Sequence, residues 1–242
     1  MDAALQTFAK RLDAVVATST GADHVGSYVH GSVVLGGFVA HRSDVDALFV
    51  VRDGHSFDAA RLAADLVEAA HPCPGRGIEV SVVTSSAAVH PAPPWPFVLH
   101  VSTEPIDART VLGATHSGDP DLLMHYAMAR AGGVPISGPP TAEVFGPVEH
   151  DAIVRYLRDE LADALDSAPR AYVVLNACRA WQFVETGALV SKVAGAAWAM
   201  GRTRDDALIR SALDEQTGRA KPAPIDARTR AFVGVVVRQL RA

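Results

Sequence analysis

Residues 28–51 read YVHGSVVLGGFVAHRSDVDALFVV, and this stretch decides the fold. Its last part, Val45 to Val51, is apolar on both faces, which is typical of a central buried strand. Asp44 and Asp46 stand at the start of that strand, and side chains two residues apart on a strand point to the same side of a sheet. The segment therefore predicts a pair of carboxylates at the mouth of a buried strand.

Two carboxylates this close repel each other, and burying either without a partner costs free energy. A divalent cation removes both problems, because Mg²⁺ accepts oxygen ligands from carboxylates and from substrate phosphates. We therefore predict a Mg²⁺ site at Asp44 and Asp46. The alternative for an isolated Asp-x-Asp pair is a polar loop that ends where the strand begins.

Gly31 and Ser32 favour the metal site over the polar loop. Glycine lets the backbone approach a ligand closely, and a helical turn is predicted directly after it, at 33–35. Free N–H groups at a helix start attract anionic oxygens, and Ser32 adds a hydroxyl donor. We predict a phosphate-binding turn, although the Walker pattern Gly-x4-Gly-Lys-Ser/Thr is absent from the sequence.

Glu79 is a third carboxylate, and it interrupts an otherwise apolar strand at 78–83. It shares a strand face with Ser81, so one interpretation is a face in contact with solvent. The functional interpretation places Glu79 beside the aspartate pair, as a third metal ligand or as a general base. A base must lie within hydrogen-bond reach of the substrate hydroxyl.

The periodicity along the chain predicts an α+β protein, with a mixed sheet and helices over residues 1–105 and an all-helical part over residues 106–242. Strands are expected at 25–30, 45–51, 78–83 and 97–101, and helices at 4–18, 57–70, 120–131, 149–166, 171–186, 191–201, 204–216 and 226–241. Proline makes 91–96 a loop and 136–148 a connection.

Charge is distributed unevenly between the two parts. The net charge is −5, which disfavours a nucleic-acid surface. Residues 1–105 hold 6 Lys and Arg against 11 Asp and Glu, whereas residues 106–242 hold 16 of each. If the first part handles a polyanion such as ATP, metal ions or the second part must supply positive charge.

Several classes of protein are disfavoured. The longest apolar runs fall short of the roughly 18 residues of a membrane span, and the first residues lack the unbroken apolar stretch of a signal peptide. The two cysteines, Cys73 and Cys178, lie too far apart for a Cys-x-x-Cys pair and suit reduced thiols. We therefore expect a cytoplasmic protein.

The motif Gly-Ser-x10-Ser-Asp-x-Asp followed by an apolar strand resembles the DNA polymerase β-like nucleotidyltransferase superfamily. A closer resemblance covers about residues 25–202, and it is to the streptomycin/spectinomycin adenylyltransferases. It rests on the stretch quoted above and on IEVSVV at 78–83, GPPTAEVFGPV at 138–148 and VVLNACRAWQFVETGALVSKVAGAAWAM at 173–200.

The resemblance implies a nucleotidyltransferase domain at 1–105 and a helical domain at 106–242 that contributes to ATP and acceptor binding. It also implies a role for each residue that matches the motif. Gly31 and Ser32 would hold the triphosphate with Ser43 nearby, Asp44 and Asp46 would bind Mg²⁺, and Glu79 would be the catalytic base.

Arg179 and Lys192 fall where the helical domain of this family reaches ATP. The alternatives are an arginine on a helix surface and a solvated lysine at a helix start. The charge distribution favours the ATP role, because it requires cations from the second part. The same helices carry Trp181 and Trp198, which we interpret as core packing.

One stretch departs from the family. The drug-binding loop of the family precedes the arginine-bearing helix and carries Trp and Asp residues. The corresponding stretch here, residues 165–170, is short, contains no Trp and has a single acid. The Trp of the family beyond the glutamate strand also has no match, although Glu104 or Asp107 would supply a carboxylate.

The reaction that the resemblance implies is attack by a substrate hydroxyl on the α-phosphorus of ATP, with one Mg²⁺ bridging the aspartates and phosphates and a second helping to activate the hydroxyl. The acceptor would be an aminoglycoside-type antibiotic or another hydroxylated small molecule, which suggests a role in antibiotic resistance. We expect the protein to be a monomer. The alternatives are a protein- or tRNA-modifying nucleotidyltransferase of the toxin–antitoxin kind and a catalytically silent nucleotide-binding regulator.

Overall fold

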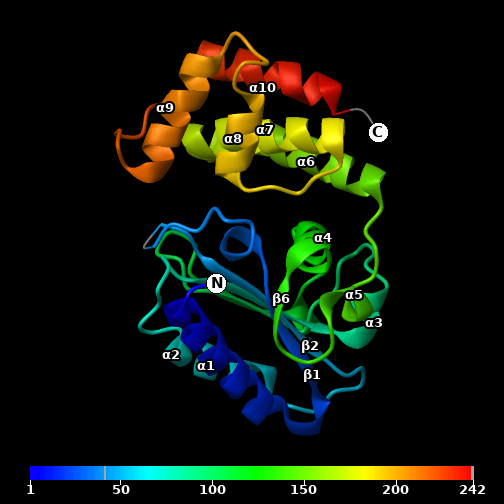
Figure 1. Ribbon diagram of the computed structural model, residues 1–242. Coiled ribbons are helices and arrows are strands. Elements are labelled where there is room, and N and C mark those ends of the chain that lie inside the picture. Colours follow the sequence, from blue (N-terminus) through cyan, green and yellow to red (C-terminus); the bar gives the residue numbers. More distant parts are fainter. Residues whose placement is uncertain (41, 241–242) are drawn as a thin grey trace. The chain divides into compact units, whose positions relative to one another are not determined.

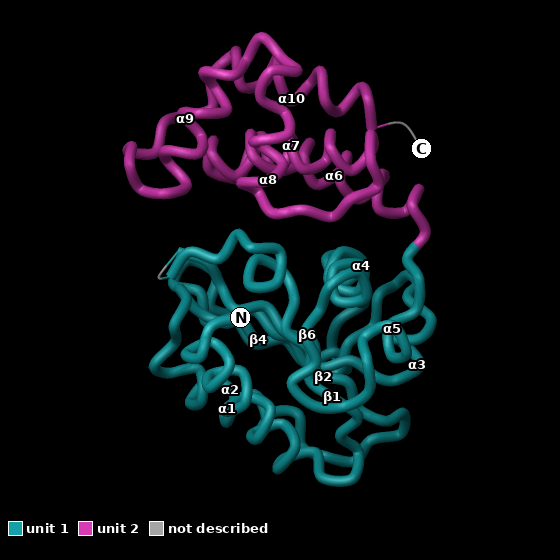
Figure 2. Tube along the Cα trace, viewed as in Figure 1, with its two compact units in different colours: residues 1–148 teal, residues 149–242 magenta. Residues whose placement is uncertain are grey.

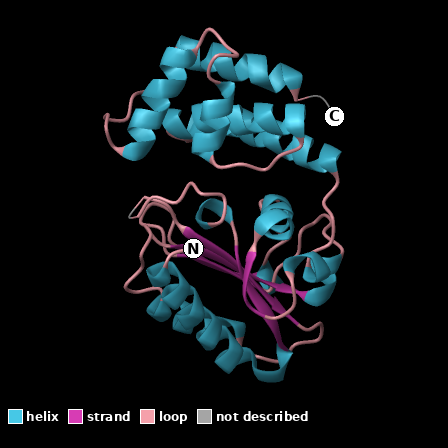
Figure 3. Ribbon diagram, viewed as in Figure 1, coloured by secondary structure: helices cyan, strands magenta, loops and turns pink. Residues whose placement is uncertain are grey.

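The computed structural model describes residues 1–40 and 42–240 and divides the chain into two compact units, residues 1–148 and 149–242 (Figure 2). The first unit contains a mixed sheet with the strand order β5-β4-β3-β2-β1-β6 (Figures 1 and 3). Its strands are β1 (His24–Val29), β2 (Val45–Val51), β3 (Ile78–Thr84), β4 (Leu99–Ser102), β5 (Arg109–Leu112) and β6 (Val134–Ser137).

β2 is a central strand, as predicted, and has the predicted bounds. It pairs in parallel with β3 and antiparallel with β1, while the outer pairs β3–β4, β4–β5 and β1–β6 are all antiparallel. From Ala47 to Val51 every residue of β2 is buried. This explains its apolar sequence, because both faces of the strand are covered.

Helices cover the two faces of the sheet differently. α1 (Ala3–Thr20) and α2 (Ala59–Ala69) pack on one face around an apolar core to which alternate residues of β2, β3 and β4 contribute. Asp2 and Asp58 cap these two helices by accepting hydrogen bonds from backbone N–H groups of the first turn. The helices α3 (Ser85–Val89), α4 (Leu122–Gly132) and α5 (Thr141–Val144) lie toward the other face (Figure 1).

The second unit is helical in the part of it that the structure describes. Its helices are α6 (His150–Ser167), α7 (Arg170–Thr186), α8 (Lys192–Ala199), α9 (Asp206–Thr217) and α10 (Ala227–Gln239). α7 is its centre, with nine buried residues, and it packs against each of the other four. The last residue of the helix predicted at 226–241, Arg241, lies outside the described residues.

The prediction that everything after residue 105 is helical is wrong. β5 and β6 both lie beyond that residue, and α4 and α5 belong to the first unit with them. The compact units accordingly divide after Val148, whereas the predicted boundary lies at 105/106. α5 falls in the stretch 136–148, which was predicted to be a connection, and α3 lies in a stretch for which no element was predicted.

β6 joins the first unit through both its backbone and its side chains. It forms the edge of the sheet beside β1. Ser137 Oγ donates to Asp13 Oδ1 at 2.6 Å, and His24 Nε2 lies 3.1 Å from the same hydroxyl. These contacts connect α1, β1 and β6, so the sheet is complete only when residues 134–137 are in place.

No helix among the described residues is both long enough and apolar enough to cross a membrane.

Candidate active site

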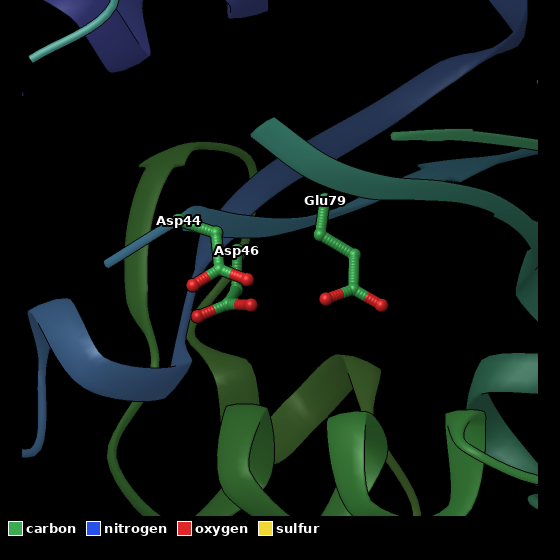
Figure 4. Close-up of side chains that lie close together, drawn as sticks. All are labelled: Asp44, Asp46 and Glu79. Atoms are coloured by element: carbon green, nitrogen blue, oxygen red, sulfur yellow. The ribbon is translucent and has the colours of Figure 1, made fainter. Parts of the chain in front are cut away.

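Three carboxylates meet at the start of the two parallel strands. Asp46 and Glu79 are direct partners in the β2–β3 register, and Asp44 lies immediately before β2. One oxygen from each of the three lies within 4.8 Å of the others. All three side chains are half-buried and point to the same side of the strands (Figure 4). The structure thus brings together the three acids that the sequence singled out.

This arrangement fits a Mg²⁺ ion. Oxygen ligands lie 2.0–2.1 Å from Mg²⁺, so ligands on opposite sides of the ion are about 4.2 Å apart. Oxygens within 4.8 Å of one another approach that spacing. Asp44, Asp46 and Glu79 are the residues that would hold the ion, and the remaining coordination positions would be open to water or phosphate oxygens.

Gly31 has a conformation that the site requires. Its φ is +65°, a region that residues with a Cβ rarely adopt. A Cβ at this position would overlap Oδ2 of Asp46. The preceding residue, His30, donates its backbone N–H to the carbonyl of Asp46 at 3.1 Å. The turn is therefore packed directly against a predicted metal ligand.

We expect Gly31→Ala to lower nucleotidyl transfer at least about a hundredfold, because a displacement of about 1 Å at a reacting centre has that effect. Gly36→Ala is the matched control. Gly36 lies in the same turn region with φ +71°, and a Cβ there would meet nothing within 4 Å. Both variants carry backbone strain, so a loss of activity in Gly36→Ala equal to that of Gly31→Ala would contradict the contact with Asp46. Thermal melts of both variants measure the shared strain.

The two serines of the motif have different surroundings. The Ser32 hydroxyl is buried and has no hydrogen-bond partner among the described residues. Ser43 Oγ accepts a hydrogen bond from the Val39 backbone N–H at 3.0 Å, and the Ser43 carbonyl accepts one from Arg76 N at 2.8 Å. Ser43 thus holds the backbone that leads into Asp44, and its hydroxyl hydrogen stays available for a ligand.

Burial raises the pKa of the Glu79 carboxyl, and the nearby negative charges of Asp44 and Asp121 raise it further. His125 and Arg109 act in the opposite direction. A general base is most effective when its pKa lies near the operating pH, and a raised pKa brings a carboxyl group closer to that value. The environment of Glu79 therefore suits a group that takes a proton.

Two residues near the carboxylates carried no decisive signal in the sequence. Glu104 follows β4, is 7% exposed and pairs with Arg76 Nη2 at 2.5 Å. His125 lies on α4, and its ring centroid is 4.9 Å from that of the fully buried His30. An isolated histidine or glutamate in a sequence has no spacing to mark it, and both are found only through the tertiary structure.

The predicted ATP-binding cations lie together in the helical unit. Tyr172, Asn176 and Arg179 form one face of α7, and Arg179 Nη1 donates to Asn176 Oδ1 at 3.1 Å. α8 crosses this face closely, since a Cβ on Gly195 would lie 2.9 Å from Arg179 Cγ. Lys192, the first residue of α8, places its Nζ 4.5 Å from the Tyr172 ring centroid. The structure brings Arg179 and Lys192 to the α7–α8 crossing.

The tryptophans of these helices pack on each other. The ring centroids of Trp181 and Trp198 are 5.1 Å apart at an interplanar angle of 85°, and both residues are half-buried. This edge-to-face contact agrees with the predicted packing role.

The loop within residues 165–170 is even shorter than the sequence indicated. α6 continues to Ser167 and α7 begins at Arg170, so only Ala168 and Pro169 separate them. The one acid of the stretch, Asp166, pairs with Arg230 at 3.2 Å, and Arg170 pairs with the buried Glu215. The charged side chains of this stretch therefore make contacts within the helical unit.

Comparisons with known proteins show the family of this chain. The family model "Aminoglycoside adenylyltransferase, C-terminal domain" matches residues 143–239. Spectinomycin 9-adenylyltransferases from Staphylococcus aureus, strains Mu50 and N315, are each 30% identical over 196 residues, which is 74% of this chain and 72% of theirs. The chain belongs to the aminoglycoside adenylyltransferase family.

The fold of a solved structure confirms the predicted architecture. The crystal structure of spectinomycin adenyltransferase AAD(9) from Enterococcus faecialis with ATP and spectinomycin matches over 100% of both chains, with a TM-score of 0.71 and 14% identity. This chain and the solved adenyltransferase therefore share one fold.

Proposed function

We propose that this protein is a Mg²⁺-dependent adenylyltransferase that transfers AMP from ATP to a hydroxyl group of an aminoglycoside-type antibiotic, with spectinomycin as the first acceptor to expect. The observation that carries the proposal is the convergence of Asp44, Asp46 and Glu79 behind the Gly31 turn. The names of the relatives, which are spectinomycin 9-adenylyltransferases, support the choice of acceptor. The role would be antibiotic resistance.

In the proposed reaction, the acceptor hydroxyl oxygen forms a bond to the α-phosphorus of ATP, the bond from that phosphorus to the bridging oxygen breaks, and pyrophosphate leaves. Glu79 takes the hydroxyl proton, and Asp44, Asp46 and Glu79 are the residues that would hold Mg²⁺. When bound, Mg²⁺ would neutralise phosphate charge and favour ionisation of the hydroxyl. Gly31, Ser32 and Ser43 hold the triphosphate, and the protein contributes chiefly position and charge.

We further propose that Arg179 and Lys192 bind ATP. Their proximity on α7 and α8 and the shortage of cations in residues 1–105 support this role. We expect Lys192→Ala to raise the KM for ATP about tenfold, since hydrogen bonds to charged groups contribute about 1.5–3 kcal/mol. Lys221→Ala, at an exposed position of the same unit, is the control. Equal KM values for Lys192→Ala and wild type would exclude the role.

The experiment that tests the function is pyrophosphate release with ATP and Mg²⁺ across a panel of streptomycin, spectinomycin, other aminoglycosides and lincosamides. We expect release with spectinomycin and none without an acceptor. Absence of pyrophosphate release with every acceptor of the panel would contradict the proposal. AMP labelling of a protein or tRNA would then favour the toxin–antitoxin alternative, and tight ATP binding without any transfer would favour the regulator.

We also propose that the protein works as a monomer in the cytoplasm, where ATP and Mg²⁺ are available. Light scattering coupled to size-exclusion chromatography should then give a mass near 25.5 kDa. A mass of twice that value would contradict the monomer.

A further inference from the structure

A row of directly paired residues crosses the sheet from the candidate metal site to the β5 edge. Asp46 pairs with Glu79, and Glu79 pairs with Ser102 on β4. Ser102 in turn pairs with Arg109 on β5. Residues paired in this way point to the same face of a sheet, with neighbouring Cβ atoms about 4.5–5.5 Å apart. The Arg109 side chain therefore lies on the face that carries the predicted metal ligands.

The two ends of this row would contact different substrates in the proposed reaction. The Gly31 turn, which would hold the triphosphate, packs against Asp46 on the β1 side of the row. Glu79, which would take the proton of the acceptor hydroxyl, stands between Asp46 and Ser102. If the phosphates lie on the β1 side of Glu79, the rest of the acceptor extends over β4 and β5, where it meets Arg109.

Arg109 neutralises a carboxylate on this acceptor side of the sheet. Its Nη1 donates to Asp107 Oδ2 at 2.7 Å, and the side chains are 42% and 52% exposed, so a ligand can reach both. Asp107 N donates to the Glu104 carbonyl at 3.0 Å, and this turn keeps Asp107 close to the end of β4. An unpaired carboxylate at this place would attract a cationic acceptor, whereas the ion pair carries no net charge.

A second carboxylate close to the end of β4 is paired in the same way. Glu104 accepts a hydrogen bond from Arg76 Nη2 at 2.5 Å. Glu104 and Asp107 are the two acids that the sequence suggested as substitutes for the missing family residue near the acceptor. The structure gives each of them an arginine partner, so neither presents an uncompensated negative charge to a cationic antibiotic.

We propose that the Arg109–Asp107 ion pair is a specificity determinant: by neutralising Asp107, Arg109 selects hydroxylated acceptors of low positive charge over polycationic aminoglycosides. The inference rests on the proposed function, which places the acceptor hydroxyl beside Glu79. It distinguishes spectinomycin, whose basic groups are secondary amines, from streptomycin, which carries permanently charged guanidinium groups. Removal of the Arg109 charge should therefore strengthen the binding of streptomycin more than that of spectinomycin.

The test is the affinity of the full-length protein for streptomycin and for spectinomycin, measured by isothermal titration calorimetry at low ionic strength. Arg109→Gln leaves Asp107 unpaired and should bind streptomycin about tenfold more tightly than wild type, an effect between the limits that water and a protein surface set for one charge contact. The gain should shrink as salt is added, because salt screens exposed charges. The double variant Arg109→Gln with Asp107→Asn has no charge at either position and should return to the wild-type affinity.

Arg61→Gln is the matched control. Arg61 is an exposed arginine that pairs with Asp65 at 2.9 Å on α2, which packs on the opposite face of the sheet. The substitution leaves an aspartate unpaired, as Arg109→Gln does, and should change neither affinity. In pyrophosphate release, the ratio of kcat/KM for streptomycin to that for spectinomycin should rise in Arg109→Gln and stay at the wild-type value in Arg61→Gln.

Equal streptomycin affinities of Arg109→Gln and wild type would overturn the inference. A double variant that keeps the whole gain would also overturn it, because Arg109 would then act by direct repulsion and not through Asp107. Tighter binding with an unchanged kcat/KM ratio would place the bound streptomycin away from the acceptor site, with the same consequence. Thermal melts establish that each variant is folded. Failure of the proposed function appears separately, as absence of pyrophosphate release by wild type with every acceptor while the streptomycin affinities still differ.

Discussion

Asp46→Asn will lower the rate of AMP transfer at least about a thousandfold while leaving the protein folded, because a catalytic metal ion supplies several kcal/mol and each 1.36 kcal/mol is a factor of ten. Asparagine has the shape of aspartate, so the Gly31 turn still fits against it. Removing one of three neighbouring carboxylate charges relieves the repulsion among them, and we expect a melting temperature near that of wild type. Initial rates of pyrophosphate release and thermal melts measure the two quantities.

Mg²⁺ gives an independent readout of the same prediction. A ligand that binds only the folded state raises its stability, so Mg²⁺ should raise the melting temperature of wild type and have little effect on Asp46→Asn. Asp65→Asn, on α2 and paired with Arg61, is the matched control and should respond to Mg²⁺ as wild type does. Full activity in Asp46→Asn would remove the metal site from the proposed mechanism.

Glu79→Gln will separate the two roles proposed for this residue. Loss of a general base lowers the rate by typically 10²- to 10⁴-fold, and we expect a value in that range. If Glu79 acts only as a base, Mn²⁺ affinity stays at the wild-type level while the rate falls. If it is also a ligand, both fall together, and this is the result we expect from carboxylate oxygens within 4.8 Å of one another.

Glu143→Gln is the control for this variant, since Glu143 is an exposed glutamate on α5. It should leave both the rate and the affinity unchanged. A normal rate in Glu79→Gln would show that the acceptor hydroxyl loses its proton by another route.

The central strand was the easiest part of the fold to predict from sequence. β2 is covered on both faces, so its composition alone distinguishes it. The proximity of Asp46 and Glu79 was harder, because it depends on the β2–β3 register, which no local pattern encodes. The resemblance to a family supplied that information, and the structure agrees with it.

β6 could not be predicted, and its position in the sheet explains why. It is only four residues long and contains Pro135, which normally argues against a strand. Proline is tolerated there because β6 lies at the edge of the sheet and pairs on one side only.

The surroundings of Glu104 were equally difficult to predict. The sequence marked it only as a carboxylate that would contact the antibiotic. Its partner Arg76 lies 28 residues earlier in the chain, where nothing marks the pairing.

The pairing of β6 with β1 sets an order of events on the ribosome. β1 ends at Val29 and β6 begins at Val134, and at about 5–20 residues per second the intervening chain takes roughly 5 to 20 seconds to synthesise. Throughout that interval one edge of β1 has no partner from its own chain, and an open edge is a template for pairing with another molecule. The nascent protein is therefore most exposed to aggregation after β2 and β3 have been made and before β6 emerges.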